Sequence, residues 1–204
     1  MATPTIADYL KYANLQMAAE AFLVVEKGTS TIIATGTPKE NLIVALIQGN
    51  DRASRFTQSE AQKFEADWEV VAQIPNTQTG FSGTLFRCKV TDPSRGLVEG
   101  EYVISFRSTE FVDDAVRDSA ATNTLEIHDT GWAWGQIADM EAWYKKLKGD
   151  GLLPAGAVLN VTGYSLGGHL ATAFNILRHE QREAAEIGNV IMNSNRGRIP
   201  LALH

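Results

Sequence analysis

The most informative part of this chain is VLNVTGYSLGGHL, residues 158–170. Its first part is apolar and rich in β-branched residues, which predicts a buried strand of a parallel sheet over residues 157–161. Apolar residues then recur at helical spacing, at Leu166, Leu170, Phe174 and Leu177, and predict a helix. Gly163 and Gly167 flank Ser165 in the turn between these elements. The order of strand, tight turn and helix predicts an α/β fold.

The Gly-x-Ser-x-Gly turn predicts a nucleophilic serine. A strained turn that lifts one hydroxyl above the sheet edge has room only for small residues two positions before and after it. Gly163 and Gly167 meet this need, in the pattern of the nucleophile elbow of α/β-hydrolases. The turn also points the first N–H groups of the helix at the space above Ser165. The Leu166 N–H is therefore the expected donor to an oxyanion.

Two other interpretations of this turn compete with a catalytic serine. Gly-x-Ser-x-Gly occurs by chance in many proteins, but here a predicted strand and a predicted helix flank it. A phosphate-binding loop is the other Gly-rich turn between strand and helix, yet the chain carries neither G-x-G-x-x-G nor Gly-Lys-Ser/Thr at this place. A nucleotide-binding α/β domain is therefore disfavoured.

Composition predicts one globular domain over residues 1–204, since 44% of the residues are hydrophobic and 21% are charged. A net charge of −6 and the lack of a basic run argue against nucleic acid as a partner. The single cysteine, Cys88, is expected to be a packed core thiol. No Cys/His spacing resembles a zinc site, so we expect neither a metal nor a cofactor.

The N-terminal segment lacks the pattern of a signal peptide, because Asp8 and Lys11 interrupt its apolar stretch. No run is long enough for a membrane span. We expect a soluble protein, either cytoplasmic or exported by a C-terminal signal that lies outside this chain.

The remaining elements are predicted from periodicity and turn residues. A first helix opens at Thr3-Pro4, and its apolar stripe comprises Ile6, Leu10, Ala13, Met17 and Ala21. Further helices are expected at 60–69 and 135–147, and strands at 84–90, 102–106 and 189–192. Strand 84–90 alternates in polarity and predicts an edge or antiparallel strand. The sequence predicts a mainly parallel sheet with helices on both faces.

Three motifs together resemble the class 3 lipases. They are SFRST at 105–109, HDTGW at 128–132 and GYSLGG at 163–168, whereas the family shows Phe-Arg-Gly-Ser/Thr, His-x-Gly-Phe and Gly-His-Ser-Leu-Gly-Gly in this order. The chain departs from the family at Ser108, Trp132 and Tyr164, where glycine, phenylalanine and histidine are usual. None of these changes removes a group that the reaction needs. The first 80 or so residues carry no such motif.

The resemblance implies an α/β-hydrolase fold and a role for each matching residue. Ser165 is the expected nucleophile, and Thr109 is the expected oxyanion-hole residue beside Leu166. Asp118 stands near the position of a family carboxylate that orients the Thr109 hydroxyl. A place on an acidic helix face exposed to water is an equal alternative for Asp118. His128 corresponds to a structural histidine of the family and is not expected to be the base.

The triad acid and base are harder to place. In α/β-hydrolases Asp or Glu and then His follow the serine, but no aspartate follows Ser165 here. His169 and His179 point along the predicted helix, and His204 is the last residue. We therefore expect a partial α/β-hydrolase domain, incomplete on its C-terminal side and truncated from a longer lipase-like protein.

Two classes of function remain open. One is a lipase or esterase that cleaves carboxylic esters of lipids through an acyl-enzyme on Ser165, with transient contact to a lipid interface. The other is a catalytically incomplete fragment or pseudo-hydrolase that binds apolar ligands or a partner chain. A chain that lacks the later strands would expose a sheet edge and could self-associate.

Overall fold

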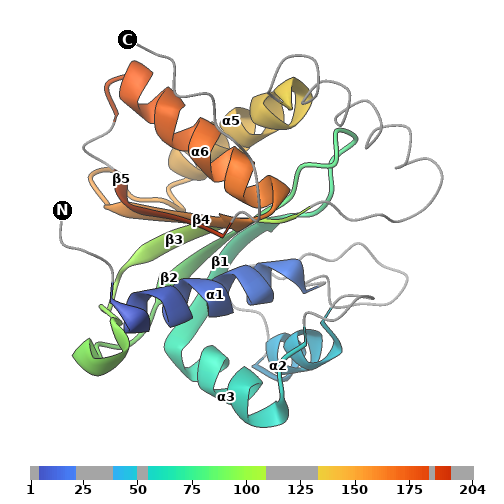
Figure 1. Cartoon of the computed structure of the whole chain (residues 1–204), viewed down its shortest axis with the longest axis vertical. Helices are drawn as coiled ribbons and strands as arrows, with labels where there is room; N and C mark the ends of the chain where they lie inside the picture. Colours follow the sequence, from blue (N-terminus) through green and yellow to red (C-terminus); the bar gives the residue numbers. More distant parts are fainter. Residues whose placement is uncertain (1–4, 22–38, 50–54, 109–132, 184–186, 194–204) are drawn as a thin grey trace.

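A computed structural model describes residues 5–21, 39–49, 55–108, 133–183 and 187–193. These residues form an α/β structure with one five-stranded sheet and helices on both of its faces (Figure 1). The strands lie in the sheet in chain order: β1 (Trp68–Ile74), β2 (Gly83–Cys88), β3 (Tyr102–Phe106), β4 (Leu159–Tyr164) and β5 (Ile187–Asn193). The predicted strand–turn–helix at residues 158–170 is confirmed as β4 followed by α6 (Leu166–Glu180).

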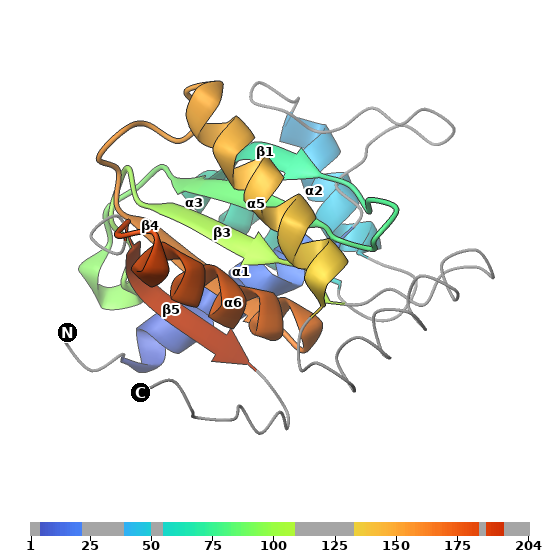
Figure 2. The same cartoon turned by 90° about the horizontal axis from the view of Figure 1, so that it is seen from above.

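The prediction of a mainly parallel sheet holds in part, because the sheet is mixed. β2 is antiparallel to both β1 and β3, whereas β3, β4 and β5 are parallel to one another (Figure 2). Short connections between consecutive strands favour antiparallel pairing, and parallel pairing needs a longer crossover such as a helix. β2 is therefore antiparallel as predicted but lies inside the sheet, since β1, which was not predicted, covers its outer side.

Two helical layers cover the sheet. α1 (Ile6–Glu20), α2 (Lys39–Gln48) and α3 (Gln58–Asp67) lie on one face, and α5 (Trp134–Gly149) and α6 lie on the other (Figures 1 and 2). Each face has its own hydrophobic core: Tyr12, Leu46, Phe64 and Phe86 belong to the first, and Phe106, Tyr144 and Phe174 to the second. Cys88 is buried in the first core, as predicted, and burial raises the pKa of its thiol.

The predicted apolar stripe of the first helix was wrong at its N-terminal end. Ile6 is 88% exposed and Leu10 is 63% exposed. α1 begins instead with a capping box between Thr5 and Asp8, and it buries a different set of apolar residues, namely Tyr12, Leu15, Ala18 and Ala19. The helix has two faces of comparable apolar content, so only the sheet beneath it decides which one is buried.

A row of polar side chains crosses the face of the sheet that α1 covers. Gln73, Thr84, Ser105 and Thr162 pair in register from β1 to β4, and all four are buried. Thr162 Oγ1 accepts a hydrogen bond from Gln16 Nε2 (2.5 Å) and donates one to the Ile191 carbonyl oxygen (2.8 Å). Among the described residues, the hydroxyls of Thr84 and Ser105 find no hydrogen-bond partner. Such groups weaken a fold, because burial removes their water.

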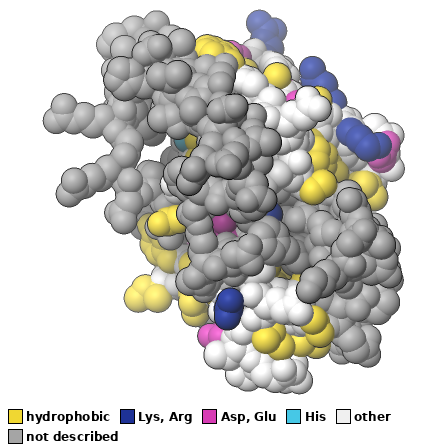
Figure 3. All heavy atoms as spheres, turned by 90° about the vertical axis from the view of Figure 1, so that its right-hand side faces the viewer, with side chains coloured by type: hydrophobic (Ala, Val, Ile, Leu, Met, Phe, Trp, Pro, Cys, Tyr) yellow, Lys and Arg dark blue, Asp and Glu magenta, His cyan; other side chains and the backbone are white. Residues whose placement is uncertain are grey.

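The described part of one face of the molecule is mixed in character (Figure 3). On the described part of the face in Figure 3, hydrophobic, charged and other polar side chains alternate without one large patch of a single kind. None of the described helices combines the length and the apolar composition that crossing a membrane requires.

Candidate active site

Ser165 lies at the turn between β4 and α6 with an unusual backbone conformation. Its φ is 52° and its ψ is −119°, and only one other described non-glycine residue, Arg182, has a positive φ. A residue with a Cβ atom adopts this region at a cost of about 1–3 kcal/mol. The Ser165 side chain is exposed and does not cap the N–H groups of α6, although this residue occupies the N-cap position. The hydroxyl is therefore presented outward.

The two glycines of the turn are required by close backbone contacts. A Cβ atom on Gly167 would lie 2.2 Å from the Phe106 carbonyl oxygen, and one on Gly163 would meet the backbone of Gly167 and Gly168. The start of α6 thus packs directly on the ends of β3 and β4. This contact is the tight turn that the sequence motif predicts.

The N-terminal end of α6 faces the same place. The N–H groups of Gly168 and His169 donate to the Ser165 carbonyl oxygen (3.0 and 3.2 Å). Leu166 and Gly167 precede them in the first turn of the helix, where backbone N–H groups have no intrahelical acceptor. The helix dipole adds partial positive charge at this end, which favours an anion beside the Leu166 N–H.

The end of β3 is held by the last turn of α1. Ser108 N–H donates to Glu20 Oε1 (2.7 Å), and Arg107 Nη2 donates to the Glu20 carbonyl oxygen (2.9 Å). Glu20 is 7% exposed and Arg107 is 5% exposed. Burial lowers the pKa of Arg107 to about 10, against the opposing effect of Glu20, so its guanidinium still carries a charge at neutral pH.

α1 also reaches β4 just before the elbow. Gln16 Nε2 lies 2.5 Å from Thr162 Oγ1 and 3.3 Å from the Gly163 carbonyl oxygen. Sequence reasoning missed both Gln16 and Glu20, because polar residues on an amphipathic helix are expected to face water. Their spacing of four positions places them on one helix face, but nothing in the sequence identifies that face as buried.

The other residues that the sequence singled out fall into two groups. Thr109, Asp118, His128, Trp132 and His204 lie outside the described residues. His169 is half-buried in the first turn of α6, where burial lowers its pKa, and His179 is exposed near the end of the same helix.

No described histidine, aspartate or glutamate forms a hydrogen bond with the Ser165 hydroxyl. Within the part of the chain that the structure describes, no cluster of three or more His, Cys, Asp or Glu side chains could hold a metal ion. The described part of the site therefore comprises Ser165, the N-terminus of α6 and the end of β3 that is hydrogen-bonded to α1.

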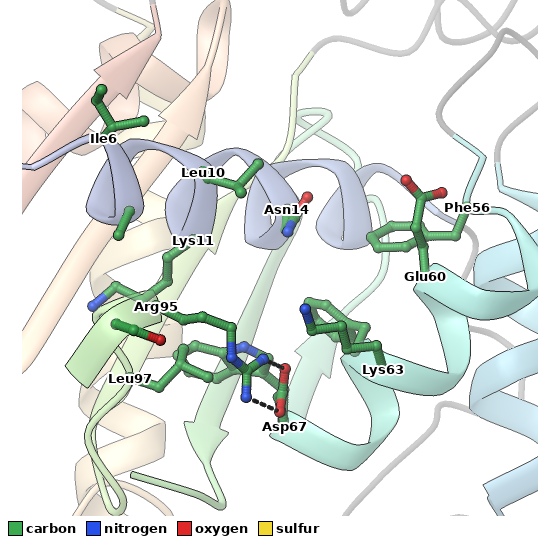
Figure 4. A pocket seen from close by; sticks show the side chains of 14 residues that line it. Ile6, Leu10, Lys11, Asn14, Phe56, Glu60, Lys63, Asp67, Arg95 and Leu97 are labelled. Carbon is green, nitrogen blue, oxygen red and sulfur yellow. Dashed lines mark hydrogen bonds and ion pairs between the residues drawn. The ribbon is translucent and has the colours of Figure 1, made fainter. Parts of the chain in front are cut away.

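A separate hollow of about 590 Å³ opens between α1, α3 and η1 (Pro93–Arg95) (Figure 4). Its base carries the ion pair between Arg95 and Asp67, and Phe64, Trp68 and Leu97 line its apolar part. None of the elbow residues lines it.

The chain shows no likeness that would assign it to a family. No family model, curated protein or solved structure matches it.

Proposed function

We propose that this protein is a serine ester hydrolase that forms an acyl-enzyme on Ser165. The observation that carries the proposal is the backbone of Ser165, which is strained at a strand-to-helix turn with its hydroxyl exposed. Strain of this kind persists where the surrounding structure imposes it, and it concentrates at functional sites. A serine with a purely structural role would have no need of it.

The proposed reaction has two steps. Ser165 Oγ attacks the carbonyl carbon of an ester, its proton passes to a base, and the tetrahedral intermediate expels the alcohol after protonation of the leaving oxygen. Water then attacks the acyl-enzyme and releases the carboxylic acid and free Ser165. The Leu166 N–H at the positive end of α6 is the first oxyanion donor, and Thr109 is the proposed second donor.

The resemblance of the three motifs to class 3 lipases supports an α/β-hydrolase fold and lipid esters as the substrate class. The parallel arrangement of β3, β4 and β5, with α6 following β4, is compatible with that fold. Transient contact with a lipid interface belongs to the same proposal.

A second candidate is a pseudo-hydrolase that binds apolar ligands or a partner chain in the same place. It is favoured by one observation, that no described histidine or carboxylate hydrogen-bonds the Ser165 hydroxyl. An unassisted serine hydroxyl is a weak nucleophile at neutral pH.

Labelling with a fluorophosphonate, followed by intact mass measurement, separates the two candidates. The reagent forms an Oγ–P bond and releases fluoride only where the serine is activated. We expect a single adduct on the wild-type chain and none on Ser165→Ala. A folded wild-type protein without an adduct would refute the hydrolase and support the pseudo-hydrolase.

A further inference from the structure

We propose that Gln16 and Glu20, called here the α1 brace, position the end of β3 and the elbow turn relative to each other. The inference rests on the proposed function, since positioning for catalysis presupposes a reactive Ser165. Glu20 holds the β3 side, and Gln16 holds the β4 side, one helical turn apart on the same face of α1.

The contact between Glu20 and Ser108 fixes the direction of a peptide group. The Glu20 carboxylate accepts the Ser108 N–H at 2.7 Å, and Glu20 is 7% exposed while Ser108 is half-buried. A hydrogen bond to a charged acceptor is about twice as strong as a neutral one. The peptide that leads out of β3 therefore has one preferred orientation.

Arg107, which precedes Ser108 in this segment, adds a second hydrogen bond to the end of α1. Its guanidinium donates to the Glu20 carbonyl oxygen. This is one of the last carbonyl groups of α1, which accept no hydrogen bond from within the helix. Helix α1 and the end of β3 thus hold each other at two points, through the Glu20 side chain and the Glu20 backbone.

The braced segment touches the elbow directly. The carbonyl oxygens of Phe106 and Arg107 would lie 2.2 and 3.0 Å from a Cβ atom on Gly167, so no side chain separates β3 from the start of α6. A shift of β3 therefore moves the backbone beside Ser165. Misplacement of reacting groups by about 1 Å can lower a rate about a hundredfold.

Glu20 is accordingly a positioning residue, because it acts on the site through Ser108 and Arg107 and does not touch substrate. Its replacement by glutamine keeps an oxygen acceptor for the Ser108 N–H, whereas alanine removes the acceptor. Gln16→Ala removes the donor to the Gly163 carbonyl oxygen in the same way. Asp67→Ala is the control, because Asp67 is also a buried carboxylate, and it pairs with Arg95 and not with a residue of the elbow.

The test measures two properties of the full chain. The first is the exchange rate of the Ser108 amide hydrogen by NMR, which requires no activity. The second is the second-order rate of Ser165 modification by a fluorophosphonate. We expect Glu20→Ala to accelerate Ser108 exchange at least tenfold and to slow modification about ten- to a hundredfold. Glu20→Gln is expected to stay within about threefold of wild type in both, and Asp67→Ala should leave both unchanged while it lowers the melting temperature.

Each outcome has one meaning. Unchanged Ser108 exchange in a folded Glu20→Ala protein overturns the brace. Faster exchange with an unchanged modification rate overturns its positioning role. A wild-type protein that is not modified refutes the proposed hydrolase and with it the catalytic part of the inference, while Ser108 exchange still decides whether Glu20 holds β3. If Glu20→Ala does not fold, the same comparison is made with Gln16→Ala through exchange of the Tyr164 and Ser165 amides.

Discussion

A Cβ atom on Gly163 would lie 2.1 Å from the carbonyl oxygen of Gly167. The two glycines of the motif are therefore in contact with each other's backbone across the turn that carries Ser165. Backbone atoms of a strand and a helix cannot yield as the end of a flexible side chain can. The turn is consequently intolerant of any side chain at these two positions.

Replacement of either glycine by alanine should destabilise the whole fold. We expect Gly163→Ala and Gly167→Ala each to lower the free energy of unfolding by about 3 kcal/mol or more, because overpacking against fixed backbone forces strands apart. Urea denaturation followed by circular dichroism measures this. Gly149→Ala is the control, since a Cβ atom added at the end of α5 would meet nothing within 4 Å and the change should be neutral or slightly stabilising. Equal stability of all three variants would contradict the close contact.

The strain at Ser165 predicts opposite effects of two small substitutions. Ser165→Gly should raise the free energy of unfolding by about 1 kcal/mol. Glycine adopts a φ of 52° without strain, and this gain exceeds the loss that comes from the greater entropy of the unfolded glycine chain. Ser165→Ala keeps the Cβ atom and the strain, so its stability should match that of wild type. Both variants should lose labelling. A Gly variant that is less stable than the Ala variant would show that the backbone is not strained.

In the polar row across the sheet, we expect the Thr84 hydroxyl to destabilise the fold and the Thr162 hydroxyl to stabilise it. Thr84→Val replaces a buried hydroxyl that has no partner in the described part of the chain by a methyl group of the same shape. It should raise the free energy of unfolding by about 1 kcal/mol. Thr162→Val makes the same change at a hydroxyl with two partners and should lower it by about 1–3 kcal/mol, because Gln16 and the Ile191 carbonyl lose their hydrogen bonds. Chemical denaturation of both variants compares them directly. The same sign for both would contradict the hydrogen-bond assignment.

His169 predicts a loss of stability in mild acid. Burial lowers its pKa in the folded protein below the ordinary value of 6.5, so the unfolded chain binds the proton more readily. Its contribution to stability is complete above pH 6.5 and is lost as the pH falls from 6.5 through the lowered pKa. We expect the melting temperature of His169→Gln to fall less between about pH 7 and pH 5 than that of wild type. His179→Gln changes an exposed residue of the same helix, and its melting temperature should depend on pH as that of wild type does. The same pH dependence in wild type, His169→Gln and His179→Gln would show that His169 is not the cause.

Much of the fold could be predicted from local patterns. The elbow, α6, α5, β2 and β3 were found because their turn residues and periodicity are strong and agree with the packing that surrounds them. β1 was missed because Trp68 and Phe64 also fit a helical spacing, and its pairing with β2 depends on residues distant in the chain. The antiparallel direction of β2 was among the expectations, but its place inside the sheet was not, because that place depends on its pairing with β1.

The candidate site divides in the same way. The candidate serine and its two glycines could be identified from the motif alone, because a strained turn between strand and helix admits only small residues at those places. Only the tertiary structure showed that Gln16 and Glu20 of α1 lie buried against that turn. The reason is physical: a helix with two similarly apolar faces does not encode which of them meets the sheet, and the meeting of α1 with β3 and β4 decides it.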